Sequence, residues 1–482
     1  MQDWDGGAVE AGAELGGWTA RGQARPWRER AAGRARERSR ARPTARPSKF
    51  WARLFTTLAW IGGIVSVALV IPVTTIHDLG TTAGLATAIG RFTGMGGTFL
   101  MLITILLIGR IPAVERALGQ DRLIRWHRIL GPWIIVLLAA HALFITVGYG
   151  LGVHAGLIHE VAILVATFPG MLGAVVGLGL LLLVAFTSYR NVRKHMKYET
   201  WWSVHLYTYL AAAVSFTHQL AVGAPFLGHP AARAFWIALW LLTAGVVLSY
   251  RFGLPLVRSL THRLKVARVE HEAPGVVSVV VRGRKLDDLP VDGGQFLHWR
   301  ILKPGMWWQA HPYSLSAMPS GNEMRITVKA AGDHSSALAE LQPGTRVAIE
   351  GPYGAFTKHA RETDRLVLIG AGVGVTPVRA MLEDLPDHVD VVVVLRGSNE
   401  HELVLRDEVA RLVGERGGRL HEVVGPRSQA PLDAQHLRRL VPDISERDVF
   451  VCGPGGFMRH VIDTTRSLGV PGERIHNEDF AF

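Results

Sequence analysis

Four histidines stand inside two strongly apolar segments of this sequence, His127 and His141 in the first, His205 and His218 in the second. Ionisable side chains within a membrane are costly and usually mark a function. The two separations, 14 and 13 residues, correspond to about 20 Å along an α-helix. Two such helices can hold two metal macrocycles between them, one near each face of a bilayer, because imidazole is a common axial ligand of haem iron. Histidines that only pack against neighbouring helices are the alternative, which the matching pairs disfavour.

The second pair predicts a distortion of its helix. At about 100° per residue, a separation of 14 residues returns to nearly the same helix face, whereas 13 residues miss that face by about 140°. A kink or a short 3₁₀ or π turn corrects such a mismatch, and these irregularities are common at functional positions. We therefore expect an irregularity within residues 206–217.

The apolar residues separate a membrane part of the chain from a soluble part. Six segments are long enough to cross a bilayer, at residues 51–73, 91–109, 127–149, 167–188, 201–222 and 232–252. The loops 74–90, 150–166 and 223–231 contain no Lys or Arg, whereas the other loops are rich in them. The positive-inside rule therefore places both termini in the cytoplasm of a multi-pass plasma-membrane protein. In this topology His127 faces His205 near the cytoplasmic side and His141 faces His218 near the outer side.

Half of the net charge of the chain lies at its N-terminus. Residues 1–53 hold 12 Lys and Arg against 6 Asp and Glu, within a formal net charge of +12 for the whole chain. We expect residues 1–49 to be a disordered basic cytoplasmic tail before the first membrane helix, and no nucleic acid as a partner. The single cysteine, Cys452, excludes an internal disulfide. The apolar stretch 153–166 is expected to form an interfacial helix on the outer side.

After the last apolar segment the residue pattern becomes that of soluble domains. Short strands between Gly, Pro and Asp turns are expected at residues 276–281, 295–299 and 324–329, which is typical of a small antiparallel barrel. From residue 365 strands alternate with helices, at 366–369, 378–385, 389–395 and 448–452, which indicates a doubly wound parallel sheet.

We therefore predict a multidomain chain with an all-α six-helix transmembrane bundle, an antiparallel β-barrel domain and an α/β doubly wound nucleotide-binding domain. After the tail, the expected ranges are 50–255, 262–356 and 364–482.

A flavin site is predicted in the barrel domain. In His311-Pro312-Tyr313-Ser314 an aromatic ring stands beside a hydroxyl, which suits a flavin because the ring covers the isoalloxazine and the hydroxyl bonds its reactive edge. Downstream of Lys329, Ser335 and Ser336 open a helix whose N-terminus could hold a pyrophosphate. A plain helix N-cap is the alternative for these serines.

A nicotinamide nucleotide site is predicted at the second sheet. The candidate residues between the first strand and its helix are Gly370, Gly372, Gly374, Thr376 and Pro377, where glycines let the backbone approach a dinucleotide phosphate. The next strand ends in Arg396 and Ser398 without an acidic residue, which favours the 2′-phosphate of NADPH over NADH. Cys452-Gly453-Pro454 follows a further strand at the same sheet edge, and no basic residue that would make Cys452 a nucleophile is identifiable in the sequence.

With these motifs the chain resembles the NADPH oxidase and ferric reductase superfamily over about residues 50–482. The resemblance implies that the four histidines bind two b-type haems and that the soluble domains form a ferredoxin-NADP reductase-like module for FAD and NADPH. It also implies that an aromatic residue of the C-terminal Asn477-Glu478-Asp479-Phe480 lies against the flavin, and Phe480 is favoured over Phe482. Phe480 and Ser314 are then the candidate catalytic residues.

The implied activity is transfer of electrons from cytoplasmic NADPH through FAD and two haems to an acceptor on the outer face, either ferric iron or another metal, or molecular oxygen. Superoxide-producing relatives in animals carry a further His where this chain has Ile145, whereas Arg91 matches their outer arginine. Electron delivery to quinone or to a periplasmic protein is an alternative. A transporter with a nucleotide-sensing domain, its histidines forming a proton relay, is an alternative of another class.

Overall fold

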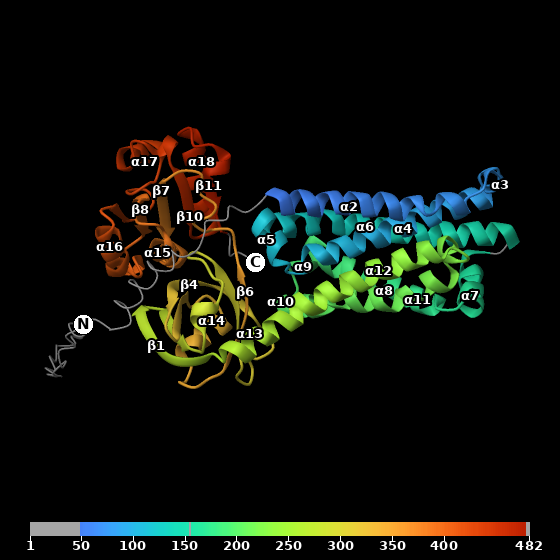
Figure 1. The fold of residues 1–482 in the computed structure, drawn as a ribbon, viewed down its shortest axis with the longest axis horizontal. Helices are drawn as coiled ribbons and strands as arrows, with labels where there is room; N and C mark the ends of the chain where they lie inside the picture. Colours follow the sequence, from blue (N-terminus) through green and yellow to red (C-terminus); the bar gives the residue numbers. More distant parts are fainter. Residues whose placement is uncertain (1–48, 154–155, 479–482) are drawn as a thin grey trace, which may run out of the picture.

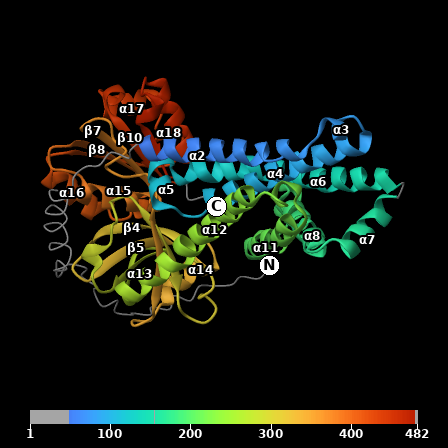
Figure 2. The ribbon, with the colours of Figure 1, turned by 45° about the vertical axis from the view of Figure 1, so that its right-hand side comes forward.

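The computed structural model describes residues 49–153 and 156–478. The predicted tail, apart from Lys49, and the predicted ring of Phe480 lie outside the described residues. Figure 1 shows an elongated helical bundle with two soluble domains at one of its ends. Figure 2 shows that α3 (Ile76–Leu79) and α7 (Leu157–Thr167) lie at the opposite end of the bundle. The helix α7 confirms the predicted helix in the apolar stretch 153–166.

Long apolar helices form the bundle. The remaining helices on the membrane side are α2 (Lys49–Ala68), α4 (Thr82–Leu107), α5 (Pro112–Leu118), α6 (Gln120–Val153), α8 (Met171–Ser188), α9 (Arg190–Arg193), α10 (Tyr198–His205), α11 (Tyr207–Val222), α12 (Pro230–Val247) and α13 (Leu254–His262). A π-helical turn, Leu248–Gly253, joins α12 to α13.

Five helical stretches are long and apolar enough to cross a membrane: Phe50–Val73, Thr82–Leu107, Arg122–Leu151, Met171–Ser188 and Pro230–His262. The predicted span 201–222 is instead divided, because α10 ends at His205 and α11 begins at Tyr207. At the break, the Tyr209 amide donates to the Leu206 carbonyl oxygen three residues back, at 3.0 Å. The predicted irregularity between His205 and His218 is confirmed at Leu206, whereas the count of six spans stays a prediction.

Glycines bring the bundle helices close together. A Cβ atom added at Gly97 of α4 would lie 2.9 Å from the Leu138 side chain of α6, and one at Gly173 of α8 would lie 2.4 Å from the Val214 carbonyl oxygen of α11. Small residues at such positions let membrane helices pack backbone against backbone. The helices that carry the histidines are therefore held in place by the glycine faces of α4 and α8.

The first soluble domain is an antiparallel sheet. Its strands are β1 (Lys265–Ala273), β2 (Val276–Arg282), β3 (Phe296–Ile301), β4 (His311–Ser320), β5 (Glu323–Lys329) and β6 (Val347–Tyr353). They lie in the order β1-β2-β5-β4-β3-β6. The two edge strands approach each other at one end, where Lys265 and Arg346 form a bridge. Full closure into a barrel stays a prediction. The motif that begins at His311 lies within β4.

The second soluble domain is a five-stranded parallel sheet in the order β11-β10-β7-β8-β9. Its strands are β7 (Arg365–Ala371), β8 (Asp390–Gly397), β9 (Arg419–Val424), β10 (Asp448–Cys452) and β11 (Ile475–Asn477). Its helices are α15 (Val375–Asp384), α16 (Arg406–Glu415), α17 (Ala434–Leu440) and α18 (Gly455–Ser467). Val393 of β8 belongs to one hydrophobic core and its neighbour Val392 to another. Both faces of the sheet are therefore covered, as expected for a doubly wound fold.

A buried ion network joins the two soluble domains. Arg325 of β5 donates to both carboxylate oxygens of Glu408 on α16, at 2.9 and 2.8 Å. Arg379 of α15 donates to the same carboxylate at 2.8 Å. These three side chains are almost fully buried. Breaking such a pair is strongly destabilising because it leaves an uncompensated charge in the interior, so the network fixes the two sheets relative to each other.

Candidate functional site

The four histidines lie in two pairs along the bundle. The ring centroids of His127 and His205 are 5.9 Å apart, and those of His141 and His218 are 6.4 Å apart. This is the pairing that the topology predicts. An imidazole nitrogen binds a metal at about 2 Å and lies roughly 1 Å from its ring centre, so two imidazoles on one metal place their centroids about 6 Å apart. Both pairs fit a metal macrocycle that takes two axial ligands from the protein.

The helix α4 sets the orientation of the two histidines of α6. The Nδ1 atom of His141 lies 2.7 Å from the Gly90 carbonyl oxygen, and that of His127 lies 3.4 Å from the Thr104 carbonyl oxygen. A carbonyl oxygen only accepts hydrogen bonds, so each Nδ1 carries the proton and each Nε2 keeps its lone pair for a metal. Gly90 and Thr104 are also 14 residues apart, and α4 thus repeats the histidine spacing.

The partner histidines have different surroundings. His205 ends α10, and its Nδ1 lies 3.4 Å from the Ser188 hydroxyl, which also accepts a bond from the Trp201 indole at 3.1 Å. The buried Nδ1 of His218 has no hydrogen-bond partner within the described part of the chain. This ring therefore lacks the carbonyl partner that orients each histidine of α6.

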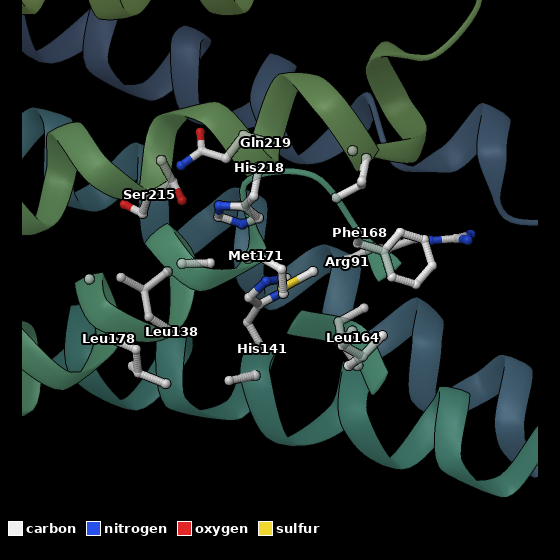
Figure 3. Close-up of a pocket in the computed structure, with 18 of the residues that line it drawn as sticks. Arg91, Leu138, His141, Leu164, Phe168, Met171, Leu178, Ser215, His218 and Gln219 are labelled. Carbon is white, nitrogen blue, oxygen red and sulfur yellow. The ribbon is translucent and has the colours of Figure 1, made fainter. Parts of the chain in front are cut away.

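A cavity of about 330 Å³ opens beside His141 and His218. Figure 3 shows His141 and His218 facing each other from opposite helices, with Arg91 directed away from them. The Arg91 guanidinium donates to the Val73 carbonyl oxygen at 2.9 Å. Gly94 lies against the His141 ring, and a Cβ atom there would be 2.5 Å from Nδ1. The imidazole therefore occupies the space that a side chain at Gly94 would fill.

The predicted flavin motif forms an aromatic cluster. The rings of His311 on β4 and His334 on α14 (Asp333–Ser336) have centroids 3.7 Å apart, and the Tyr313 hydroxyl lies 3.3 Å from His334 Nδ1. Burial, with a smaller contribution from His311, lowers the pKa of His334 to about 4, so this ring is neutral near pH 7. The buried Ser314 hydroxyl lacks a partner within the described residues. A flavin ring nitrogen would satisfy it.

The serines predicted at the pyrophosphate have a local role as well. The Ser335 hydroxyl accepts the amides of Ala331 and Gly332 at 2.9 and 3.0 Å, which is the plain capping alternative. Ser336 is exposed in the same single turn of helix. Lys329, at the end of β5, lies with the nucleotide residues described below. The sequence reasoning grouped these residues with the flavin motif because they follow it closely along the chain.

The two glycine-containing turns of the parallel sheet lie against each other. Cys452 at the end of β10 is in register with Gly370 of β7. A Cβ atom at Gly374 would lie 2.4 Å from the Cys452 carbonyl oxygen, so only glycine allows this approach. The motif residues gathered at this edge are Gly370, Gly372, Gly374, Thr376, Pro377, Cys452, Gly453 and Pro454. Dinucleotides bind at such an edge, where the strand order reverses.

A cavity of about 340 Å³ adjoins these turns, and its charged and polar lining residues are Lys329, Arg396, Ser398, Glu402, Arg427 and His460. The Arg396 guanidinium is engaged with backbone, including a bond to the Gly425 carbonyl oxygen at 2.7 Å. Arg427 is exposed at the cavity. The Ser398 amide donates to Glu402 at 2.8 Å, and this bond lowers the pKa of Glu402.

Sequence reasoning missed Glu402 and Arg427 because both follow the strand ends by several residues.

Comparison with known proteins assigns these parts. Residues 93–216 match the ferric reductase like transmembrane component, 262–357 an FAD-binding domain and 368–463 an oxidoreductase NAD-binding domain. The chain matches a ferric reductase/NADPH oxidase-like fusion. The transmembrane match includes His127, His141 and His205 and ends two residues before His218.

Individual relatives cover part of the chain. An NADPH oxidoreductase from Mycobacterium tuberculosis is 29% identical over 197 residues, which are 39% of this chain and 52% of that protein. A flavohemoprotein from Deinococcus radiodurans is 32% identical over 237 residues, 45% of this chain and 58% of its own length. The chain thus spans little more than half of these curated relatives. The FAD/NAD-binding domain of a nitric oxide dioxygenase from Vibrio cholerae aligns in structure with 26% identity and a TM-score of 0.39, over 45% of this chain and 98% of that one.

The ferric reductase-like domain meets the FAD-binding domain through a charged cluster that the sequence reasoning did not predict. Arg110, just after α4, places its Nε 3.8 Å from Glu350 of β6 and its guanidinium 4.3 Å from the Tyr353 ring centre. Arg251 approaches the same carboxylate at 4.0 Å, and the Tyr353 hydroxyl donates to it at 3.2 Å. Nearby on α5, burial raises the pKa of Glu115 to about 7. In the sequence analysis, these arginines contributed only to the positive-inside pattern of the basic loops.

The end of the described chain returns to the FAD-binding domain. A Cβ atom at Gly354 would lie 2.9 Å from the Glu478 carboxylate and 3.2 Å from the Phe296 ring. Phe296 pairs with Ser314 in the sheet. Glu478 therefore lies beside β3, the strand that pairs with the one carrying the candidate flavin hydroxyl, and the stacking role of Phe480 stays a prediction.

Proposed function

We propose that this chain transfers electrons from cytoplasmic NADPH, through FAD and two b-type haems, to a small-molecule or metal-ion acceptor at the outer face of the plasma membrane. When bound, FAD converts two-electron chemistry to single electrons, and the haems carry these across the bilayer. The observation that carries the proposal is that the imidazole rings lie in two pairs, one after the other along the bundle. The ring centroids are 5.9 Å apart in one pair and 6.4 Å apart in the other. Imidazole side chains from two helices would hold each haem, and a group held in this way suits electron transfer.

Residues of this chain define where each step takes place. His127 and His205 would receive electrons, since α6 follows α5, which contacts β6 of the FAD-binding domain. His141 and His218 would deliver them at the far end. Ser314 would bond the flavin edge and Tyr313 would cover its ring. On the nucleotide side, Arg396, Ser398 and Arg427 would hold a 2′-phosphate, so NADPH is favoured over NADH. Glu402 in the same cavity would accept a bond from a ribose hydroxyl that carries no phosphate.

The first experiment separates the two histidine pairs. The purified wild-type protein should show a haem Soret band that NADPH reduces without oxygen. In His141→Ala the haem at His127 and His205 should still be reduced, while transfer to an external acceptor stops. In His127→Ala NADPH should still reduce the flavin, but the remaining haem should stay oxidised. His159→Ala, an exposed histidine of α7, is the matched control. Absence of a Soret band in wild-type protein from haem-replete cells would refute the proposal and favour a histidine proton relay.

A second experiment identifies the electron acceptor. Ile145 and Arg91 line the cavity at the outer pair, and Arg91 is bonded to the backbone of the first span. A hydrophobic side chain at 145 offers no hydrogen bond to oxygen, so reduction of a ferric chelate is the favoured outcome. Fe(III) reduction measured without oxygen, beside superoxide formation in air, decides between them. Activity only with added quinone would indicate a lipid-soluble acceptor instead.

A further inference from the structure

A large groove lies between the end of the last membrane helix and the FAD-binding domain. Its volume is about 780 Å³, and its walls are α13 with the preceding π turn on one side and β3 and β6 on the other. Both ribbon views show α13 leaving the bundle along this domain (Figures 1 and 2). None of the nucleotide or flavin motif residues discussed above lines this groove, so the groove is distinct from both of those candidate sites.

The groove is strongly cationic. Its charged lining residues are Arg251, Arg263, Lys265, Arg300 and Arg346, with Glu350 as the single carboxylate. That carboxylate is already within 4.0 Å of Arg251. Arg263, Lys265 and Arg346 are exposed and form no ion pair with a carboxylate anywhere in residues 49–153 and 156–478. Several unpaired cations around one concave surface create a positive potential that attracts an anion.

One wall of the groove is apolar and continues a membrane span. Phe252, Leu256 and Leu260 line it and are 64%, 60% and 62% exposed. They follow one another at four-residue intervals and therefore form one stripe along the helix. The helical stretch Pro230–His262 has 33 residues, about 50 Å in length, whereas the hydrocarbon core of a bilayer is about 30 Å thick. Its last turns must therefore leave the hydrocarbon, where acyl chains meet headgroups.

The loop that follows β3 also indicates that the groove lies at the membrane surface. Leu302 lines the groove and is 44% exposed, and Trp307 in the same loop is 60% exposed. The Trp307 carbonyl oxygen accepts a bond from Arg300 at 3.1 Å, which ties the loop to the cationic wall. Tryptophan with neighbouring basic residues is typical of segments at the membrane surface.

We propose that this groove binds an anionic phospholipid from the leaflet on the side of the soluble domains. The phosphate would lie among Arg263, Lys265 and Arg346, and an acyl chain would lie along Leu256 and Leu260. A soluble nucleotide would leave the apolar wall exposed to water. The chain's own N-terminal segment is a poor occupant because its excess of Lys and Arg would be repelled. The inference requires only that the helices span a membrane and does not depend on the electron-transfer function.

The test uses the full-length protein in nanodiscs of dioleoyl phosphatidylcholine with increasing amounts of dioleoyl phosphatidylglycerol, with bound lipids counted by native mass spectrometry. Phosphatidylglycerol should be retained preferentially and lost at high salt. The double variant Arg263→Gln/Arg346→Gln should weaken its binding about 30-fold, since each basic residue near a membrane surface contributes about 1 kcal/mol to binding an anionic lipid and ~1.4 kcal/mol is a factor of ten. The control Arg438→Gln/Arg439→Gln removes the same charge from the exposed side of α17 and should have no effect.

Two further measurements distinguish a bound lipid from a bound inorganic anion. Leu256→Ser should weaken phosphatidylglycerol binding with no change in charge, and inorganic phosphate should not displace the lipid. If the double variant fails to fold, Lys265→Gln at an exposed position tests the same claim. Equal retention of both lipids, unchanged binding in the groove variants, or displacement by phosphate alone would each overturn the proposal. A protein without haem but with this lipid preference would refute the proposed function and leave the groove assignment intact.

Discussion

Gly94→Ala tests the proposed outer haem site most directly. The added methyl group would lie 2.5, 2.9 and 3.0 Å from three atoms of the His141 imidazole. Its neighbour is a rigid ring, held by the bond from Nδ1 to the Gly90 carbonyl oxygen at 2.7 Å, so the methyl group cannot be accommodated by rotation of a flexible chain end. The ring must move, and the orientation of its Nε2 changes with it.

The expected size of the effect follows from the overlap. Forcing a methyl group into a well-packed site costs about 1–3 kcal/mol. If this cost falls on the ligated state, haem affinity at His141 and His218 decreases by roughly 5-fold to 150-fold, because ~1.4 kcal/mol is a factor of ten. The pair of His127 and His205 has no contact with Gly94 and serves as an internal reference.

The assay follows haem transfer from the detergent-solubilised protein to an excess of apomyoglobin. The variant should lose one haem of two much faster than the wild type and keep the other. Gly96→Ala is the matched control on the same helix, since a Cβ atom there would meet only Val67 at the ordinary distance of 3.8 Å. If Gly94→Ala loses haem no faster than Gly96→Ala, the assignment of His141 as a ligand in this orientation is refuted.

Three further predictions concern the soluble side. Glu408→Gln should lower stability by about 3–5 kcal/mol, because Arg325 would stay buried without its anionic partner, whereas Glu415→Gln in an exposed pair of α16 should cost under about 1 kcal/mol; equal thermal midpoints would contradict this. Because burial raises the pKa of Glu115 from 4.5 to about 7, its carboxyl stabilises the fold below pH 4.5 and this contribution is lost as the pH rises through 7. Glu115→Gln should therefore be more stable than wild type at pH 8, by up to about 3 kcal/mol, and should match it at pH 4; a pH-independent difference would argue against this. Arg427→Ala should raise KM for NADPH about tenfold or more and leave KM for NADH unchanged, and an equal rise for both would remove Arg427 from the 2′-phosphate site.

Local patterns were sufficient for much of this architecture. Apolar runs identified the membrane part, alternating strands and helices identified the parallel sheet, and β10 (Asp448–Cys452) was predicted to the residue. The separation of 13 residues between His205 and His218 was enough to predict an irregularity within residues 206–217, which the structure places at Leu206, because helix periodicity is a property of the backbone alone. Such features depend on residues that are neighbours along the chain.

Tertiary structure alone decided which distant residues meet. The carbonyl groups of Gly90 and Thr104 that orient two histidines carry no sequence signal, since every residue has a carbonyl group. Arg110 reaches Glu350, and Arg325 reaches Glu408, from another domain, and a charge in a strand or helix looks the same whether it faces water or another domain. The sequence by itself therefore determined the elements and the candidate ligands, whereas packing determined their orientation and the contacts between domains, because burial and charge pairing depend on what the fold places opposite each side chain.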